Sequence, residues 1–325
     1  MNSPTGQPRN VCHVVAAVIV NAHGEVLVSR RHANAHQGGL WEFPGGKVEA
    51  HETALQALRR ELHEELGIEL RAARPLIRIP HQYPDQAVLL EVWRVSAFRG
   101  EAHGREGQPV QWLAPTRLRE FAFPAANRPV VVAARLPDRY LITPEPGADF
   151  SARLERAFAA GIRLVQLRAR TLPEADYLQL ARSVCAQARR HGAEVLLNAD
   201  PAQAALIVQI AEVGAAGVHL SAARLRTLER RPLPADLWLA ASCHTADELA
   251  QAARIGCDFA VLGPVQATAS HPGAPPLGWE ALRTLTEHAA LPVYALGGLH
   301  PADLEAAWQA GAQGIAAIRA LWPEL

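Results

Sequence analysis

Residues 46–68 read GKVEAHETALQALRRELHEELGI, which predicts a loop followed by an amphipathic helix. Leucines at positions 55, 58, 62 and 66 fall on one arc of that helix. The carboxylates of Glu61, Glu64 and Glu65 share the adjoining face, because residues three and four apart are neighbours on a helix. Gly67 is well placed to end the helix. The segment therefore predicts a helix that buries one side and presents three acids beside it.

This acidic face has two interpretations. Most charged helix faces are only solvated surface. Three adjacent carboxylates repel one another, however, unless a cation lies among them, and divalent ions such as Mg²⁺ and Mn²⁺ prefer oxygen ligands. The preceding residues 38–46, GGLWEFPGG, are rich in glycine, which lets the backbone at Gly45 approach a metal or a phosphate. We therefore expect a Mg²⁺ site, with Mn²⁺ as the alternative.

The spacing within this segment resembles the signature box of the Nudix family. Nudix enzymes hydrolyse nucleoside diphosphates linked to another group, and the glutamates of the box hold the metal. The resemblance implies that Glu61, Glu64 and Glu65 are metal ligands and that Arg60 orients them through charge-assisted hydrogen bonds. Every fixed position of the box is matched, by Gly46, Glu52, Arg60, Glu61, Leu62, Glu64, Glu65, Gly67 and Ile68.

Flanking motifs resemble the MutT-type 8-oxo-dGTP diphosphatases over about residues 12–134. The motifs are RRxxxxH at 30–36, WEFPGGK at 41–47, YPD at 83–85, GxEGQPxxW at 104–112 and FPxANxP at 123–129. The resemblance implies that Glu106 joins the metal site as ligand or base, that Asn127 reads the oxidised purine and that Arg31 holds the phosphate side. The remaining implied substrate-binding residues are His36, Phe43, Asp85 and Pro124. Gln86 departs from the pattern, because the bacterial enzyme has an arginine there.

Each implied role has a plainer alternative. Asn127 before Arg-Pro is a common turn residue, although an amide offers a purine edge both a donor and an acceptor. Phe43 suits the core as well as it suits stacking on a base. Glu106 lies in a polar loop where a solvated glutamate is ordinary. His36 and His81 are expected to be structural or substrate-lining, because Mg²⁺ prefers oxygen.

Composition limits the class of partner and the location. The chain has 325 residues, enough for two domains, and Lys+Arg and Asp+Glu both total 32, so no basic field favours a nucleic-acid polymer. The four cysteines form no Cys-x-x-Cys pair, which fits a reducing cytoplasm. No apolar run approaches the roughly 18 residues that span a bilayer. We expect a cytoplasmic protein with small-molecule partners and no membrane contact.

The second half predicts a small (β/α)₈ barrel of the TIM type. After a short linker at residues 136–139, eight apolar runs alternate with helical stretches such as 174–191 and 245–255. The predicted fold class is therefore α/β in two domains. Residues 1–10 form a tail, 11–135 a Nudix α/β/α sandwich and 140–325 the barrel. The predicted strands are 140–143, 164–168, 195–198, 217–220, 239–242, 259–263, 293–296 and 314–318.

The predicted strand ends resemble the thiamine phosphate synthase/TenI family. The motifs are QLR at 166–168, GVHL at 217–220, SCH at 242–244, GPV at 263–265 and LGGL at 296–299. Active sites of such barrels collect at strand C-termini, and the loops after strands seven and eight commonly seat phosphate. We therefore expect a small phosphorylated ligand there. The candidate site residues are Arg168, Asn198, Ser242, His244, Thr268, Ser270, Gly297 and Gly298.

The sequence departs from that family where a synthase would hold its metal. Ala199 stands in place of an aspartate with Asp200 displaced by one, Arg224 in place of a second acid and His271 in place of a lysine. A Mg²⁺ pyrophosphate site is hard to build without carboxylates, so we expect no synthase activity. His244 matches the histidine of TenI-type thiazole tautomerases, where an imidazole can shuttle a proton. A structural Ser-x-His is the alternative.

Together these resemblances imply hydrolysis of 8-oxo-dGTP to 8-oxo-dGMP and pyrophosphate, which removes oxidised guanine before a polymerase uses it and so avoids DNA damage. Metal ions would bridge the phosphates and activate a water that attacks the β-phosphorus. A second hypothesis is a Nudix hydrolase of a thiamine-related diphosphate, with the barrel as a thiazole tautomerase. A third makes the barrel a sensor that binds its ligand without chemistry.

Overall fold

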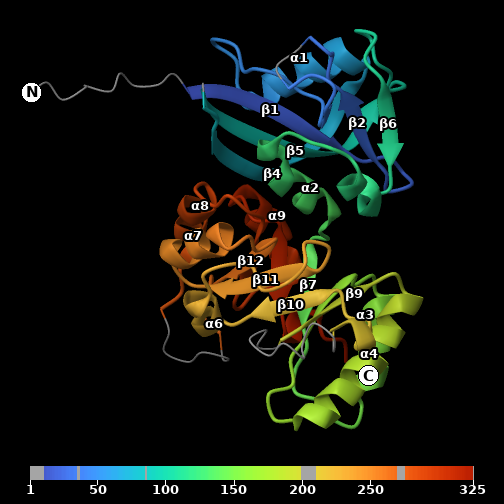
Figure 1. Ribbon diagram of the computed structural model, residues 1–325, viewed down its shortest axis with the longest axis vertical. Coiled ribbons are helices and arrows are strands. Elements are labelled where there is room, and N and C mark those ends of the chain that lie inside the picture. Colours follow the sequence, from blue (N-terminus) through green and yellow to red (C-terminus); the bar gives the residue numbers. More distant parts are fainter. Residues whose placement is uncertain (1–10, 35–36, 85, 199–209, 269–274, 325) are drawn as a thin grey trace, which may run out of the picture. The chain divides into compact units, whose positions relative to one another are not determined.

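The computed structural model describes residues 11–34, 37–84, 86–198, 210–268 and 275–324, and it divides between Arg135 and Leu136 into two compact units (Figure 1). The first unit holds two sheets and the second a closed barrel of parallel strands. The predicted class, α/β in two domains with a Nudix sandwich followed by an eight-stranded barrel, is confirmed.

Two three-stranded sheets form the first unit. One has the order β1-β5-β4, with β1 parallel and β4 antiparallel to β5, and the other has the antiparallel order β3-β2-β6. Strands β1 and β2 meet only at a Val20–Val26 bridge among the described residues, so the turn at 21–24 leads from one sheet into the other. The strands are β1 (Val11–Ile19), β2 (Val26–Arg30), β3 (Trp41–Glu42), β4 (Glu69–Gln82), β5 (Ala87–Arg99) and β6 (Val110–Leu113).

Helix α1 (Ala54–Leu66) is the predicted acidic helix. Thr53 and Gln56 form a capping box at its start, and Gly67 ends it with a left-handed backbone, φ 70°. Leu58, Leu62 and Leu66 are fully buried against residues of β1. The leucine arc thus fixes the helix to the sheet and leaves its acids at the edge of that contact.

The opposite face of β1 belongs to a second core. Ala16 and Val18 alternate with the residues that face α1, so β1 is apolar on both sides, and they pack with α2 (Arg128–Arg135). Two short 3₁₀ helices, η1 (Pro115–Glu120) and η2 (Ala125–Asn127), lead into α2. The core between the sheets and α2 includes Phe43, one of the predicted substrate-binding residues.

The second unit is a closed barrel with the cyclic order β10-β11-β12-β13-β14-β7-β8-β9. Each predicted strand is confirmed to within one residue at either end. The strands are β7 (Arg139–Ile142), β8 (Leu164–Leu167), β9 (Glu194–Leu197), β10 (Gly217–Leu220), β11 (Trp238–Cys243), β12 (Phe259–Leu262), β13 (Val293–Leu296) and β14 (Gly314–Ala317).

Helices surround this barrel. The predicted helices at 174–191 and 245–255 are confirmed as α4 and α7, and Thr245 caps α7 by accepting from the Glu248 backbone. The described helices are α3 (Phe150–Ala159), α4 (Glu174–Arg190), α6 (Ala222–Thr227), α7 (Ala246–Arg254), α8 (Gly278–Thr286) and α9 (Leu304–Gln309), with 3₁₀ turns η3 (Pro301–Asp303) and η4 (Arg319–Leu321).

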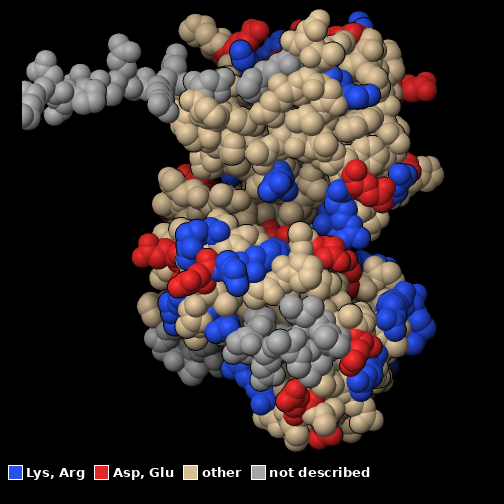
Figure 2. All heavy atoms as spheres, in the orientation of Figure 1, with Lys and Arg blue, Asp and Glu red and all other residues tan. Residues whose placement is uncertain are grey.

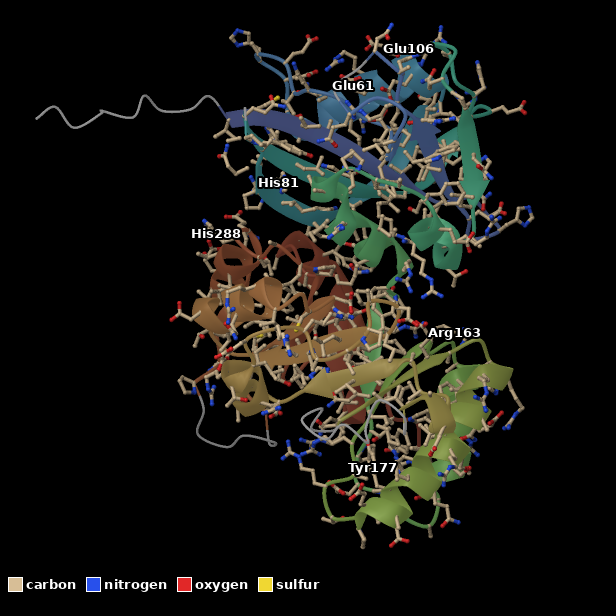
Figure 3. All side chains as sticks on the ribbon, viewed as in Figure 1. Glu61, His81, Glu106, Arg163, Tyr177 and His288 are labelled. Carbon is tan, nitrogen blue, oxygen red and sulfur yellow. The ribbon has the colours of Figure 1, made fainter. Side chains whose placement is uncertain are left out.

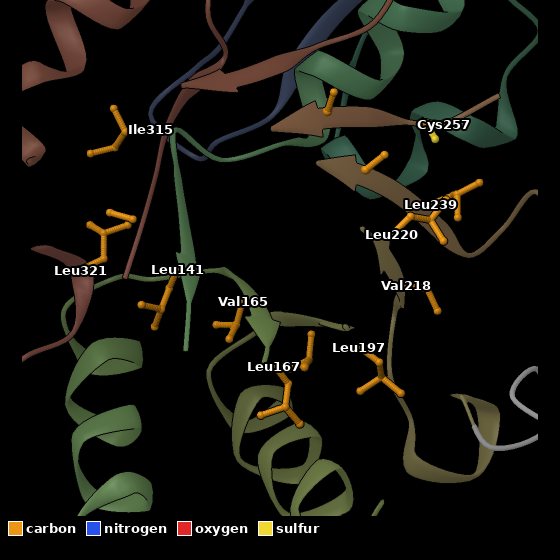
Figure 4. Packing of buried hydrophobic residues seen from close by; sticks show 14 of the residues in the cluster. Leu141, Val165, Leu167, Leu197, Val218, Leu220, Leu239, Cys257, Ile315 and Leu321 are labelled. Atoms are coloured by element: carbon orange, nitrogen blue, oxygen red, sulfur yellow. The ribbon is translucent and has the colours of Figure 1, made fainter. Parts of the chain in front are cut away.

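Alternation along the barrel strands separates two sets of side chains. Aliphatic residues such as Leu141, Val165 and Ile315 point outward and pack with the helices (Figure 4). The interior is aromatic, because the Tyr140 ring lies 5.4 Å from Phe259 and 5.5 Å from Tyr294, centroid to centroid. The barrel is therefore a filled core, and its chemistry is confined to the rim.

Residues 136–138 are hydrogen-bonded to the barrel. The Leu136 carbonyl accepts from the Gln313 side chain at 3.0 Å, the Pro137 carbonyl accepts from the Tyr294 hydroxyl and the Asp138 carbonyl accepts from the Ile315 backbone at 3.0 Å. The segment expected to be a short linker is thus held to the second unit by three bonds.

No described helix is both long enough and apolar enough to cross a membrane. Acidic and basic side chains are interspersed over the face that Figure 2 shows, as expected from equal totals of the two charges.

Candidate functional site

Glu65 is the most strongly perturbed acid of the predicted metal face. Its Oε2 accepts a 3.1 Å hydrogen bond from the Gly45 backbone, which lies in the glycine-rich loop. Burial is the main cause that raises the pKa of Glu65 to about 8; the negative charges of Glu42, Glu61 and Glu106 contribute to that rise, and the Gly45 hydrogen bond opposes it. Four carboxylates therefore act on one another at this end of α1.

Glu42 in β3 is a member of this acidic cluster that sequence reasoning did not single out, although it lies within the WEFPGGK motif. Arg31 donates a hydrogen bond to it. Burial raises the pKa of Glu42, whereas the charge of Arg31 opposes that rise. Arg31, predicted to hold the phosphate side, thus contacts the acidic cluster directly through Glu42.

Arg60 contacts two predicted ligands and the loop in front of the helix. Its guanidinium donates to Glu61 at 2.8 Å and Glu64 at 3.3 Å, and also to Glu52 at 2.7 Å and the Lys47 carbonyl at 3.0 Å. The hydrogen bond that Arg60 donates to Glu52 raises the pKa of Arg60 above its ordinary value, so the side chain stays charged. These contacts are what the predicted orienting role requires.

Gly46 allows the loop and the helix to come together. The Val15 and Ala17 amides donate to the Gly46 and Pro44 carbonyls, each at 2.8 Å, and so tie the loop to β1. A Cβ atom at Gly46 would collide with the carboxylate of Glu61. Glycine is therefore required at this position for Glu61 to lie against the loop.

The loop that carries Glu106 is attached to the C-terminal end of α1 (Figure 3). Gln108 is buried, and its side chain accepts from the Glu106 backbone at 2.9 Å and donates to the Glu65 carbonyl at 3.1 Å. The Arg105 backbone donates to the same carbonyl at 2.9 Å. Gln108 thus fixes the loop beside the acidic cluster, a role that its motif contained but that sequence reasoning did not assign.

The donor chemistry of the cluster fits a divalent cation that prefers oxygen. The described residues contain no ready-made cage of three His, Cys, Asp or Glu side chains, because Arg60 engages Glu61 and Glu64 while Gly45 engages Glu65. Burial raises the pKa of Glu65, and the charges of Glu42, Glu61 and Glu106 add to that rise, so a bound cation would favour the ionised carboxylate. The residues that would hold it are Glu61, Glu64, Glu65, Glu106 and the Gly45 backbone.

Three of the predicted substrate-binding residues, Phe43, Pro124 and Asn127, lie in described parts of the first unit near its second core. Phe43 is only 3% exposed and stacks on Phe123 with centroids 5.3 Å apart, so its ring is part of that core. Pro124 is buried, and the Asn127 backbone donates to its carbonyl at 2.9 Å in η2. His36 and Asp85 lie outside the described residues. His81, in β4, packs edge-on to Tyr83 (Figure 3).

Seven of the eight predicted barrel residues are described, and each lies in or just after the C-terminal end of a strand, or in the loop that follows it. Ser270 lies outside the described residues, as do Ala199, Asp200 and His271. Gly298 adopts φ 68°, and a Cβ there would come within 2.6 Å of the Ala267 carbonyl oxygen. The loops after β12 and β13 therefore approach each other closely at this rim.

Arg168 is held at the end of β8 by its neighbours. Its backbone donates to the Thr143 hydroxyl at 2.9 Å, which in turn donates to the Arg168 carbonyl at 3.2 Å. Its guanidinium lies 3.9 Å from Glu145, and burial lowers the pKa of Arg168 below its ordinary value. The charge is thus partly desolvated at the rim, which suits contact with an anion.

His244 follows β11 and is fixed through two bonds. Its backbone donates to Glu248 at 2.6 Å, and its Nδ1 lies 2.7 Å from the Gly263 carbonyl. Because a carbonyl only accepts, Nδ1 carries the proton and Nε2 is left as the acceptor. Glu248, which also accepts from Arg226, is a buried positioning residue that sequence reasoning missed.

His219 lies inside the barrel instead of at its rim. It is 1% exposed, its Nδ1 lies 3.1 Å from the Tyr140 hydroxyl and its Nε2 lies 2.9 Å from Ser242 Oγ. Burial lowers the pKa of His219 to about 3. The ring is therefore neutral at physiological pH.

Two surface hollows lie away from these residues. One of about 320 Å³ is beside α1, and one of about 710 Å³ lies between α7 and the end of α8. None of the predicted site residues lines either hollow. Their linings include Arg59, His63 and Arg71 in the first and Ala246, Ala250, Leu285 and His288 in the second.

Comparisons with known proteins match the two units separately. Residues 15–133 match the family model described as NUDIX domain, and residues 139–321 match thiamine monophosphate synthase. The 8-oxo-dGTP diphosphatase of Escherichia coli (strain K12) is 39% identical over 118 residues, which cover 36% of this chain and 92% of that protein. The CTP pyrophosphohydrolase of the same organism is 36% identical and covers 37% and 88%.

One relative spans both units. The thiamine-phosphate synthase of Gloeobacter violaceus is 33% identical over 300 residues, covering 86% of this chain and 85% of that protein. The alignment therefore extends over residues of both units.

Burial of neutral His219 predicts a pH dependence of barrel stability. The pKa of about 3 lies below the ordinary 6.5, so the contribution of His219 to stability is present above pH 6.5 and is lost as pH falls toward 3. His219→Gln should lower the slope of unfolding free energy against pH by up to about 1.4 kcal/mol per unit between pH 4 and 6. Denaturant unfolding, repeated at a series of pH values between 4 and 6, measures this slope. Tyr294→Phe, which keeps His219, should retain the wild-type slope, and equal slopes for His219→Gln would contradict the prediction.

Proposed function

Because the chain belongs to the Nudix family through residues 15–133 and to the thiamine monophosphate synthase family through residues 139–321, we propose that it is a metal-dependent 8-oxo-dGTP diphosphatase fused to a barrel that binds a small phosphorylated ligand. The first domain would release 8-oxo-dGMP and pyrophosphate. The activity would serve nucleotide-pool sanitation in the cytoplasm, where the unpaired Cys12, Cys185, Cys243 and Cys257 would stay reduced.

The observation that carries the proposal is the cluster of acids around Glu65. Glu42, Glu61 and Glu106 raise its pKa together with burial, and Arg60 fixes the helix side of the cluster. An isolated buried acid is destabilising, whereas an acid cluster at a glycine-rich loop is suited to Mg²⁺ and phosphate. The arrangement supports phosphoryl chemistry better than it supports a solvated helix face.

The mechanism follows from where these side chains lie. Mg²⁺, when bound, would neutralise phosphate charge and make a coordinated water more acidic. Glu106, on the loop that Gln108 fixes, would accept a proton from an attacking water. Arg31 would break its contact with Glu42 and bind the phosphates instead. Arg60 would keep Glu61 and Glu64 oriented throughout. Attack would occur at the β-phosphorus.

Recognition of the oxidised purine would depend on Asn127. It ends η2 directly before α2, beside the core that contains Phe43 and Pro124, and its side chain is half-buried. An amide at such an edge can offer a donor and an acceptor to one base. Phe43 would support the pocket from the core instead of presenting an open stacking face.

CTP is the second nucleotide to consider, because the curated CTP pyrophosphohydrolase is nearly as similar to this chain as the 8-oxo-dGTP diphosphatase. A thiamine-related diphosphate is the third substrate to consider, and the fused relative named thiamine-phosphate synthase favours it. A hydrolysis panel with 8-oxo-dGTP, dGTP, CTP and thiamine diphosphate in Mg²⁺ tests all three, with pyrophosphate measured for the nucleotides and phosphate for thiamine diphosphate. Highest kcat/KM on CTP or on thiamine diphosphate would overturn the proposed substrate.

For the barrel we propose binding without synthase activity. Arg168, Ser242 and the Gly297-Gly298 pair lie at the rim and can supply donors to a phosphate. Arg224, where the family has an acid, lies in α6 and bonds to Thr227 at 3.0 Å. His244, with Nε2 as its acceptor nitrogen, would support thiazole tautomerisation as the alternative activity.

Replacing one acid of the cluster should abolish hydrolysis. Glu61→Gln or Glu65→Gln removes an anionic ligand while keeping size, so turnover of 8-oxo-dGTP should fall by about 100-fold or more, as when a buried charged contact worth roughly 3 kcal/mol is lost. Glu69→Gln, at the start of β4 outside the cluster, is the matched control and should keep wild-type turnover. Wild-type turnover of either cluster variant at saturating Mg²⁺ would contradict the metal assignment.

Removing the proposed purine reader should change selectivity more than turnover. Asn127→Ala should reduce kcat/KM for 8-oxo-dGTP relative to dGTP by about 5- to 100-fold, because the hydrogen-bonding edge of the base loses its partner. Steady-state kinetics with both nucleotides measure the ratio. Asn21→Ala, in the turn between β1 and β2, serves as the control for a lost amide. A ratio equal to wild type in Asn127→Ala would place base recognition elsewhere.

The full chain should form no thiamine phosphate from the pyrimidine diphosphate and the thiazole phosphate. Expelled pyrophosphate needs charge neutralisation, and Ala199 and Arg224 stand where the family keeps its acids. The assay should include Glu65→Gln, because the Nudix domain could otherwise consume a diphosphate. Thiamine phosphate formed by that variant would show that the barrel is a synthase. Calorimetry that detects no heat with thiazole phosphate would remove the binding proposal.

A further inference from the structure

A chain of hydrogen bonds crosses the interior of the barrel. Tyr140 lies in β7, His219 in β10 and Ser242 in β11, and β7 is not a neighbour of β10 in the barrel. The Tyr140 hydroxyl lies 3.1 Å from Nδ1 of His219, and Nε2 of that ring lies 2.9 Å from Ser242 Oγ. The first two residues are 0% and 1% exposed, whereas Ser242 is half-buried. These hydrogen bonds therefore connect the sealed core of the barrel to its rim.

The positions of the protons follow from counting donors and acceptors. The Tyr140 hydroxyl is sealed among aromatic rings, and its polar partner in the described barrel is His219 Nδ1. A buried hydroxyl that fails to donate costs free energy, so Tyr140 donates and Nδ1 is unprotonated. Since burial keeps the ring neutral by lowering its pKa, its one proton lies on Nε2 and is donated to Ser242.

The direction of these hydrogen bonds determines whether the Ser242 hydroxyl acts as a donor or as an acceptor at the rim. A hydroxyl has one proton, and Ser242 Oγ is already accepting from His219, so that proton is directed away from the ring. In the opposite order Ser242 would donate into the ring and present only lone pairs outward. Lone pairs repel an anionic oxygen, whereas an O–H attracts it.

We propose that His219 is a positioning residue which, together with Tyr140, fixes Ser242 as a hydrogen-bond donor to an anionic oxygen of the barrel ligand. The inference rests on the proposed function of the barrel as a binder of a phosphorylated molecule. It adds a mechanism of specificity, because a set donor favours an anion over a ligand that offers only donors of its own. A histidine that only filled the core would need no fixed tautomer.

The tautomer can be measured without any ligand. Nitrogen-15 NMR of the full chain with labelled histidine, and His219→Gln to assign the signal, should show a protonated Nε2 and an unprotonated Nδ1 for His219 at neutral pH. The Tyr140→Phe variant should lose this single tautomer. A protonated Nδ1 in the wild-type chain would overturn the proposal, and this result does not depend on whether Tyr140→Phe folds.

Binding gives a second readout. The probe is 4-methyl-5-(2-hydroxyethyl)thiazole phosphate, titrated calorimetrically into the full chain with EDTA present so that the Nudix metal site takes no part. Ser242→Ala should weaken binding by about tenfold, the loss expected for a hydrogen bond to a charged group. Tyr140→Phe should weaken it about threefold or more, although its hydroxyl is sealed off from the ligand. Tyr294→Phe is the matched control, since its hydroxyl donates to Pro137, and it should bind as wild type.

The double variant Tyr140→Phe/Ser242→Ala should bind no more weakly than Ser242→Ala, because both changes remove the same donor. Fully additive losses, or wild-type affinity in Tyr140→Phe, would overturn the positioning role. Failure of the wild-type chain to bind the probe would overturn the ligand part of this proposal together with the proposed function of the barrel. The wrong tautomer beside intact binding would overturn the positioning role alone.

Discussion

The burial of Glu65 beside three other carboxylates is the constraint on which the candidate site of the first domain depends. Glu65 is held there by the leucine arc of α1, and Glu42 and Glu106 reach it from a strand and a loop distant in sequence. Arg60, the Gly45 amide and Gln108 oppose or organise this charge. Removing the packing would release the acids into solvent, where their repulsion is weak, so the reactivity of the site depends on its core.

The barrel differs from the first domain in the charge of its interior and in how it would bind phosphate. Its interior is neutral and aromatic, and even His219 is kept uncharged. At the rim, Arg168 is partly desolvated, and the Ser242 hydroxyl lies within hydrogen-bond distance of the His219 ring. The first domain would therefore bind phosphate through acids and a cation, whereas the second would bind it directly through protein donors. The two sites would differ in their response to chelators.

Local patterns in the sequence predicted much of this fold. The barrel strands are short, apolar and separated by clear helices, so each was placed to within one residue, and the box spacing located α1. The 14-residue strand β4 was not predicted, because its run of arginines and prolines lacks a strand pattern and is stabilised by pairing with β5. Glu42 and Gln108 were missed because their roles come from contacts across the fold. Phe43 suited either core or pocket, and only packing distinguishes these.

The three bonds that hold residues 136–138 have a consequence for where the barrel unit begins. A barrel begun at residue 140 would lack the carbonyls of Leu136, Pro137 and Asp138, which would leave the Tyr294 hydroxyl and the Gln313 amide without those acceptors inside the fold. The barrel as a folding unit therefore extends back to Leu136, beyond its first strand, and the boundary between the two compact units lies just before that residue.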